Sequence, residues 1–330
     1  MPREFVNYIV NRFFQVMLIV LFGFIAAFII FRLLPGDPTI SLLDPRVPPE
    51  AREELIKRFG LDRPLYEQFL LYLTNLARGD FGYSFVYIGV PVTTIIFGER
   101  LFNTVVLMSS AMLTSALLGT SLGLIMGFRG GLLDKLFTST LYLLASAPVF
   151  WVGLLIQFYA GYRLNMIPIA GTTSFYFEEV PVYVLVLDYI HHMIGPLTVL
   201  TLFFTPLYYI YVRNVVSSVR GEDFVLTLRA LGLSDLRILL RISRFALIAT
   251  VTIIANESAL LIVGAVFTET IFGWNGVGRL LYDSIFKADY PVLQGIFLLT
   301  IIVVATANFI ADILYYFLDP RIKVKGLTRR

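Results

Sequence analysis

The stretch "FFQVMLIVLFGFIAAFIIFRLL" (13–34) is long, apolar and carries a single charge, at Arg32. A helix needs about 20 mostly apolar residues to cross a bilayer. The run is too long for the apolar part of a signal peptide, and no small-x-small cleavage site follows it. We therefore expect a membrane-spanning helix here.

Further apolar runs of spanning length follow along the chain. They cover 103–128, 137–162, 196–216, 248–272 and 291–317. Hydrophobic residues make up 58% of the chain and charged residues 15%, whereas soluble domains are about 45–50% apolar. The sequence therefore predicts an all-α polytopic membrane protein with six transmembrane helices.

Basic residues predict the orientation of these spans, because Lys and Arg collect in short cytoplasmic loops. The alternate loops are poorer in basic residues than the loops after the second and fourth spans and the C-terminal segment. These three richer segments carry, in order, Arg129 and Lys135; Arg213, Arg220, Arg229, Arg237, Arg241 and Arg244; and Arg321, Lys323, Lys325, Arg329 and Arg330. We expect a multi-pass protein of the cell membrane with both termini in the cytoplasm.

Three parts are expected along the chain. Residues 1–100 hold the first span and a small external helical subdomain. In this subdomain we expect helices within 48–60 and 63–79, because each segment has proline near its start and glycine at its end. Residues 101–317 form a core of five spans with a cytoplasmic loop at 217–245. Residues 318–330 form a cytoplasmic tail, and 163–195 a second external excursion.

Little in the sequence favours catalysis. The chain has no cysteine and two adjacent histidines. "GTSLG" (119–123) matches a serine-nucleophile motif, but it lies inside a span without a histidine partner. Ser115, Gly119, Gly123 and Gly127 share one helix face, which favours close helix packing. No phosphate-binding loop occurs. We expect no catalytic residue, cofactor, metal site or nucleic-acid partner.

Polar residues inside spans are costly and often functional. Asn256, Glu257 and Ser258 fall in the middle of the fifth predicted span, and we expect them to line a translocation pathway. Glu269 and Asp312 lie nearer to span ends, where we expect structural hydrogen bonds to neighbouring helices.

The loop "FVLTLRALGLSDLRILLRISRFAL" (224–247) reads as two short helices that are broken at Leu231–Gly232. Acids at its start and glycine at the break fit a helix beginning and end. Phe224, Val225, Leu228 and Leu231 give it more apolar surface than a solvated loop needs. The residues alone leave two interpretations open: docking into a partner's groove, or lying on the lipid surface.

"TLRALGLS" (227–234) resembles the ATPase-coupling loop of ABC importer permeases of the oligopeptide/dipeptide family. Such importers have two permease subunits, and the chain resembles the first of them. Leu228, Leu231 and Ala249 depart from that family's usual alanine, lysine and proline. The resemblance extends through "FRLLPGDP" (31–38), "FGLDRPLYEQF" (59–69), "GDFGYS" (79–84), "SAPVFWVGLL" (146–155), "ETIFGWNGVGRLL" (269–281), "DYPVLQG" (289–295) and "NFIADILYYFLDPRI" (308–322).

This resemblance implies that the chain forms half of a translocation pathway and performs no covalent chemistry. It implies a second homologous permease, two ATPase subunits, an extracellular solute-binding protein and the lipid bilayer as partners. The residues expected to couple to the ATPase are Asp223, Phe224, Leu228, Arg229, Ala230, Gly232, Leu233 and Ser234. Pro35, Gly36, Asp37, Pro38, Glu269 and Asp312 belong to matching structural motifs.

The sequence leaves the substrate open between di- or oligopeptides and oligosaccharides, while the lack of histidine, cysteine and clustered carboxylates disfavours nickel. An ATP-independent secondary transporter is the alternative of another class. It would show inverted repeats or broken spans, and no such repeat is found.

Overall fold

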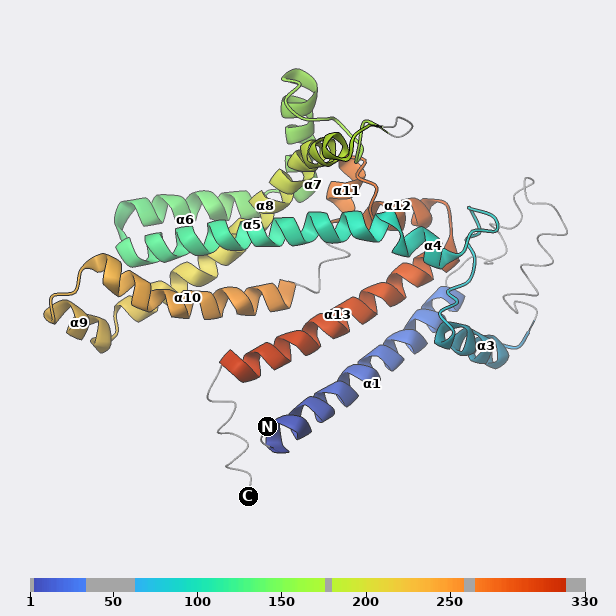
Figure 1. Cartoon of the computed structure of the whole chain (residues 1–330), viewed down its shortest axis with the longest axis horizontal. Helices are drawn as coiled ribbons and strands as arrows, with labels where there is room; N and C mark the ends of the chain where they lie inside the picture. The colour runs from blue at the N-terminus through green and yellow to red at the C-terminus, as the bar shows by residue number, and fades with distance from the viewer. Residues whose placement is uncertain (1–2, 34–62, 176–179, 258–264, 319–330) are drawn as a thin grey trace. The chain divides into compact units, whose positions relative to one another are not determined.

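The computed structural model describes residues 3–33, 63–175, 180–257 and 265–318 of the 330-residue chain. In these ranges the chain is helical apart from turns and one isolated antiparallel bridge between Tyr83 and Pro91. The predicted all-α class is therefore confirmed for this part of the chain (Figure 1). The helices form two compact units, Met1–Thr104 with Asn275–Thr306 and Val105–Trp274 with Ala307–Arg330.

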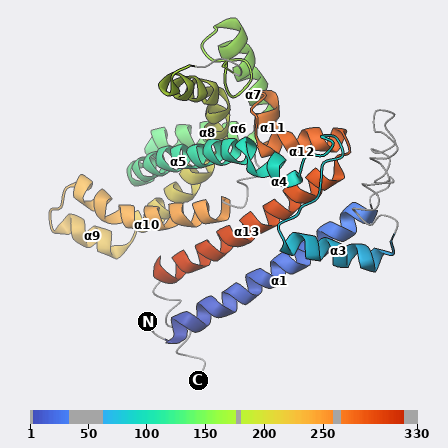
Figure 2. The same ribbon diagram turned by 45° about the vertical axis from the view of Figure 1, so that its right-hand side comes forward.

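The first unit contains two long apolar helices that lie side by side in both views (Figures 1 and 2). These are α1 (Arg3–Leu33) and α13 (Tyr290–Leu318), whose first part belongs to this unit. A Cβ on Gly23 of α1 would lie 2.8 Å from the Ile301 side chain of α13, so the missing side chain lets the helices approach. The Phe31 and Phe297 rings meet edge to face with centroids 6.0 Å apart.

Shorter helices complete this unit: α3 (Leu65–Ala77), α4 (Val92–Phe97) and α12 (Val277–Phe286). The prediction of a helix within 63–79 is confirmed, since α3 starts after Pro64 and Gly79 follows it with a φ of 77°. The Phe69 ring packs edge to face on Phe28 of α1 at 5.1 Å. The predicted helix at 48–60 and the motif Pro35, Gly36, Asp37 and Pro38 lie outside the described residues.

A buried carboxylate joins distant segments of the first unit. Asp289, before α13, is 1% exposed. It accepts hydrogen bonds from the Ser84 hydroxyl at 2.5 Å and from the Phe85 N–H at 3.1 Å. Burial raises the pKa of Asp289, while the hydrogen bonds from Ser84 and Phe85 oppose that shift. The loop before α4 is thus fixed to the start of α13.

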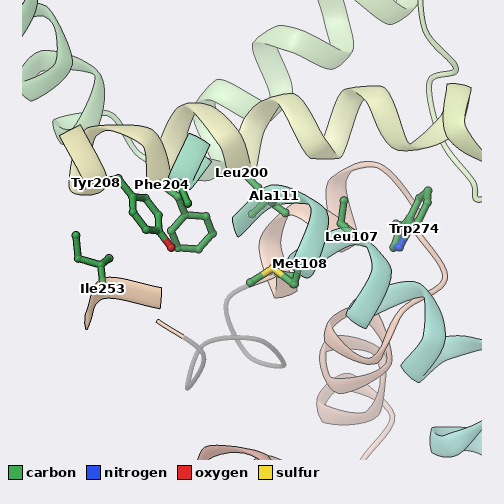
Figure 3. Packing of buried hydrophobic residues seen from close by; sticks show 10 residues of the cluster. Leu107, Met108, Ala111, Leu200, Phe204, Tyr208, Ile253 and Trp274 are labelled. Atoms are coloured by element: carbon green, nitrogen blue, oxygen red, sulfur yellow. The ribbon is translucent and has the colours of Figure 1, made fainter. Parts of the chain in front are cut away.

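The second unit is built around α8 (Val182–Arg220), against which α6, α7, α10 and α11 pack. Its other helices are α5 (Glu99–Arg129, from Val105 on), α6 (Gly131–Ser146), α7 (Val149–Ile156), the π-helix η2 (Gln157–Arg163), α9 (Asp223–Ala230), α10 (Asp235–Glu257) and α11 (Val266–Ile271). A cluster of buried apolar side chains from α5, α8 and α10 includes Leu107, Phe204 and Ile253 and reaches Trp274 (Figure 3).

The predicted small-residue face of 115–127 packs on α8, as expected. A Cβ on Gly119 would lie 2.5 Å from the Tyr208 Cβ, and one on Gly123 would lie 2.8 Å from the Tyr209 carbonyl oxygen. At Gly127 the distance to the Arg213 carbonyl oxygen would be 2.7 Å. Three glycines, one helical turn apart, therefore let the backbones of α5 and α8 touch, which is the packing mode of small residues in membrane helices.

Four described helices are long and apolar enough to cross a membrane, or five spans if one bent pair counts as a span. The four are Val6–Phe31, Val92–Arg129, Val182–Arg220 and Tyr290–Ile313, and they contain most of the runs predicted at 13–34, 103–128, 196–216 and 291–317. The run at 248–272 comprises the end of α10, residues outside the described ranges, and α11. Six spans therefore remain a prediction.

The third predicted span, at 137–162, falls on a bent pair of helices, and it stays a prediction that this pair crosses the membrane as one span. The bent pair consists of Gly131–Ser146 and Val149–Arg163, which meet at 95°. Pro148 explains the break, because proline disfavours helical backbone at the preceding residue. Ala147 accordingly has an extended conformation, with φ −75° and ψ 136°.

The predicted external excursion at 163–195 overlaps the start of α8, and its external position stays a prediction. Helix α8 already begins at Val182, so the second half of that segment is helical. Pro196, which marked the expected start of the fourth span, lies inside the helix. A proline removes one backbone hydrogen bond without ending a helix that its neighbours support.

Candidate functional site

The loop at 217–245 folds as a short helix, α9, followed by the charged half of α10. Asp223 lies in the first turn of α9, as favoured by the helix dipole. At its end Gly232 has a φ of 75°, and the Leu233 N–H bonds to the Leu228 carbonyl oxygen at 3.2 Å. This six-to-one bond with a left-handed glycine is a Schellman-type helix end. The predicted break at Leu231–Gly232 is confirmed.

One face of α9 packs into the core of the chain itself. Val225 and Leu228 are buried together with Phe128 of α5, Val212 and Val216 of α8, and Ile238, Ile242 and Ala246 of α10. The Arg229 guanidinium lies over the Phe128 ring, 5.9 Å from its centroid. Only two short turns join α9 to α8 and α10, at 221–222 and 231–234. These contacts fix α9 to the ends of three long helices.

The opposite face of α9 is open to solvent. Leu226 is 55% exposed and Leu231 70%, whereas Phe224, 37% exposed, faces α10, its ring 6.2 Å from the Phe245 ring. Of the other residues expected to couple to an ATPase, Asp223, Arg229, Ala230, Gly232 and Ser234 are exposed and Leu233 is half-buried. Leu228 differs, because it is 9% exposed and belongs to the internal core. The apolar surplus of this loop therefore divides into a part buried in the core and a part that is exposed.

Sequence reasoning missed Leu226 as part of the outward face. Val225 and Leu228 are three residues apart and share one helix face, which places Leu226 away from the core. The helical period could have separated the two sets.

The residues expected to line a pathway lie at the end of α10. Glu257 is the last residue of α10 and is half-buried. The Tyr208 side chain of α8 is close enough to interact electrostatically with it. The Tyr208 hydroxyl is buried and has no hydrogen-bond partner among the described residues. Figure 3 shows Tyr208 beside Phe204 and Ile253. Ser258 and the side chain of Asn256 lie outside the description.

The two acids assigned to structural motifs occupy different environments. Glu269 in α11 is fully buried, and its backbone carbonyl oxygen accepts a hydrogen bond from the backbone N–H of Trp274 at 2.8 Å. Asp312 in α13 is half-buried.

A buried ion pair between α6 and α8 was not predicted. The Arg213 guanidinium donates two hydrogen bonds to the Asp134 carboxylate, the one from Nε measuring 3.0 Å. The Tyr209 hydroxyl donates to the same carboxylate at 3.2 Å, and Thr138 bonds to Tyr209 at 3.0 Å. The Asp134 side chain is 3% exposed and that of Arg213 27%. Sequence reasoning used Arg213 only as a loop charge, and no local spacing links it to Asp134.

The two histidines, both within α8, make local contacts. His192 Nδ1 lies 2.8 Å from the Asp188 carbonyl oxygen and 3.3 Å from its carboxylate. His191 Nε2 lies 3.1 Å from the Met166 carbonyl oxygen. Ser121, the serine of the "GTSLG" motif, is exposed on α5.

Comparison with known proteins identifies the family of this helical chain. Residues 119–324 match the family described as binding-protein-dependent transport system inner membrane component, and residues 5–114 match its N-terminal membrane component. The chain belongs to this family. It is thus a multi-pass membrane protein of a transport system.

Curated relatives match over almost their whole length. An oligopeptide transport system permease protein of Bacillus subtilis is 34% identical over 318 residues, which cover 96% of this chain and 99% of the relative. A di/tripeptide transport system permease of Pseudomonas aeruginosa is 34% identical over 315 residues, 90% and 92% of the two chains. A dipeptide transport system permease of Escherichia coli K12 is 31% identical over 312 residues, 89% and 91%.

Proposed function

We propose that this chain is one of two permease subunits of an ABC importer for di- or oligopeptides. The observation that carries the proposal is the similarity to permeases named for peptide transport along nearly the whole chain. Two ATPase subunits, a second homologous permease and an extracellular solute-binding protein complete the complex. The chain forms half of the translocation pathway, and ATP hydrolysis belongs to the partners.

The proposed topology has six spans with both termini in the cytoplasm. Residues 1–100 carry the first span and the external helical subdomain, 101–317 the core, and 318–330 the tail. Cysteine scanning tests it well, because the chain has no cysteine. A cysteine at Arg78, after α3, should react with an impermeant thiol reagent in intact cells. One at Asp235, before α10, should react only after the membrane is opened. Labelling of both sites in intact cells would rule the topology out.

In this function α9 is the coupling helix. Its outward face, with Leu226 and Leu231, docks into an ATPase groove, while Val225 and Leu228 hold it to the permease. This division supports docking because a helix that is fixed on one side and apolar on the other can transmit a push from a partner.

A matched pair of leucines tests the docking. Leu226→Ser on α9 should weaken co-purification of the ATPase subunits and lower peptide-stimulated ATP hydrolysis. Leu70→Ser on α3 removes a leucine of similar exposure, 58%, outside the loop and should leave both unchanged. Normal ATPase binding by the Leu226 variant would contradict the assignment of this face.

Glu257, together with Asn256 and Ser258, is proposed to line the pathway between the two permeases. A charged carboxylate that faces lipid at mid-depth costs about 2.5–3.5 kcal/mol on insertion scales, which favours a polar cavity. Glu257→Gln should assemble normally but change the rate or preference of transport, and Glu257→Leu should lower transport further. Wild-type transport by both variants would make Glu257 a structural residue.

The substrate class is tested on the whole complex in proteoliposomes. Labelled dipeptides, longer peptides and oligosaccharides are supplied outside with the cognate solute-binding protein. ATP-dependent uptake of peptides is the expected result. Uptake of oligosaccharides alone would keep the importer and replace its substrate, whereas uptake without ATP would indicate a secondary transporter.

A further inference from the structure

A pocket of about 600 Å³ lies between α9 and α10 in the second unit. It is lined by Phe224, Thr227, Leu228, Leu240, Arg241 and Arg244. Its wall thus combines apolar side chains with two guanidinium groups. Such a pocket suits a ligand that has an anionic part and an apolar part.

The α10 side of the pocket belongs to a stripe that runs along one helix face. Its members are spaced by three, four or seven residues and are exposed: Arg237, Leu240, Arg241, Arg244, Leu247 and Ile248. Residues at these spacings are neighbours on a helix surface. The opposite face carries Ile238, Ile242 and Ala246, which are fully buried in the core.

The arginines of the stripe have no acidic partner in the part of the chain that the structure describes. Among the residues that the structure describes, no carboxylate forms an ion pair with Arg237, Arg241 or Arg244. Arg244 stacks on the ring of its neighbour Phe245, with a distance of 4.9 Å to the centroid. The guanidinium groups therefore keep their donors available for an anion.

The charge pattern of α10 places the pocket at a polar–apolar boundary. After Arg244, no charged residue occurs until Glu257. On the exposed stripe the arginines are followed at once by Leu247 and Ile248. In a helix that enters a membrane, this change marks the depth of the lipid headgroups.

We propose that this pocket binds an anionic phospholipid of the cytoplasmic leaflet. Arg241 and Arg244 would hold the phosphate, and the acyl chains would lie along Leu247 and Ile248. A lipid fits both halves of the stripe, whereas an acidic side chain of a partner protein would leave the apolar half uncovered. The inference rests on the proposed function in one respect: α10 must enter the membrane from the cytoplasm.

The test uses the purified complex of permeases and ATPases, with lipid titrated in and bound lipid counted by native mass spectrometry. Phosphatidylglycerol is the anionic probe and phosphatidylcholine the zwitterionic one. Each basic residue near an anionic surface contributes about tenfold or less to affinity, so Arg241→Gln with Arg244→Gln should weaken phosphatidylglycerol binding about 10- to 30-fold. The control is Arg63→Gln with Arg78→Gln, exposed arginines in the first unit with the same change of charge.

The expected result is a loss of phosphatidylglycerol preference in the Arg241/Arg244 variant alone. Equal loss in the control, or no loss in either, overturns the proposal. Displacement of the lipid by an excess of inorganic phosphate would indicate a site for soluble anions and also overturns it. Peptide-stimulated ATP hydrolysis is measured on the same samples. If the variant loses its ATPase subunits while lipid binding stays normal, the pocket belongs to a protein interface, and the importer assignment stands without the lipid site.

Discussion

Removal of the Asp134 carboxylate should destabilise the permease more than removal of any exposed acid. In Asp134→Ala the Arg213 guanidinium loses both of its hydrogen bonds to that carboxylate, and the Tyr209 hydroxyl loses an acceptor. Breaking a buried ion pair by removing one partner costs about 3–5 kcal/mol. Arg213 keeps 27% of its side chain exposed, so water offsets part of the loss. We expect a decrease of about 3 kcal/mol in the free energy of unfolding.

The measurement is an unfolding titration of the purified complex in mixed micelles. Asp283→Ala is the matched control, because Asp283 and Arg279 form a pair at 4.0 Å whose side chains are 37% and 42% exposed. Exposed helical pairs of this spacing contribute about 0.3–0.5 kcal/mol. Equal losses for the two alanine variants would refute the assignment of Asp134 as a buried structural charge.

A second variant separates the charge from the packing. Asp134→Leu combined with Arg213→Met removes both partners, and apolar replacement of a whole buried pair is often close to neutral. We expect the double variant to recover most of the loss. If it is as unstable as Asp134→Ala, the loss comes from packing at the α6–α8 contact rather than from an uncompensated charge.

Three further outcomes are expected. Gly123→Leu should lower the free energy of unfolding of the complex by about 1–3 kcal/mol through overpacking, because a Cβ at this position would lie 2.8 Å from the Tyr209 carbonyl oxygen. Ser121→Leu, at an exposed position of the same helix, should leave it unchanged. Gly232→Val should weaken peptide-stimulated ATP hydrolysis, since φ is 75° there and left-handed backbone costs roughly 1–2 kcal/mol for most residues; Gly232→Asn should be milder. Burial raises the pKa of Asp289 above its ordinary value of 3.8, so the folded state holds the proton more tightly than the unfolded state. The contribution of Asp289 to stability should therefore fall as pH rises from 3.8 through the raised pKa. Unfolding titrations over that window should show the stability of Asp289→Asn rising relative to that of the wild type.

The sequence was sufficient for features that depend on local pattern. Apolar length identified α1, α5, α8 and α13, and the glycine spacing on α5 predicted a close helix contact. The break at Gly232 followed from composition, because glycine adopts the left-handed conformation at little cost. Each of these features is encoded within a few helical turns.

Features that depend on pairing between distant segments could not be read in this way. Asp134 and Arg213 are far apart in the chain and meet only because α6 and α8 pack together. The same holds for Ser84 and Asp289. Pro148 did carry a local signal for the bend between α6 and α7, but the apolar run around it suggested a continuous span. Apolar length measures how well a segment fits lipid, and it does not report whether the helix is straight.

The attachments of α9 decide how a force on it would spread. Val225 and Leu228 lie in one core with Phe128, Val216 and Ile238, so α9 cannot move freely as a loop would. A push on its outward face must displace the ends of α5, α8 and α10 together, since core packing transmits strain rather than absorbing it. The glycine contacts join α5 to α8, and the ion pair joins α6 to α8. A force on α9, as proposed for a coupling helix, would therefore reach α5, α6, α8 and α10 through packing and hydrogen bonds that the structure already makes.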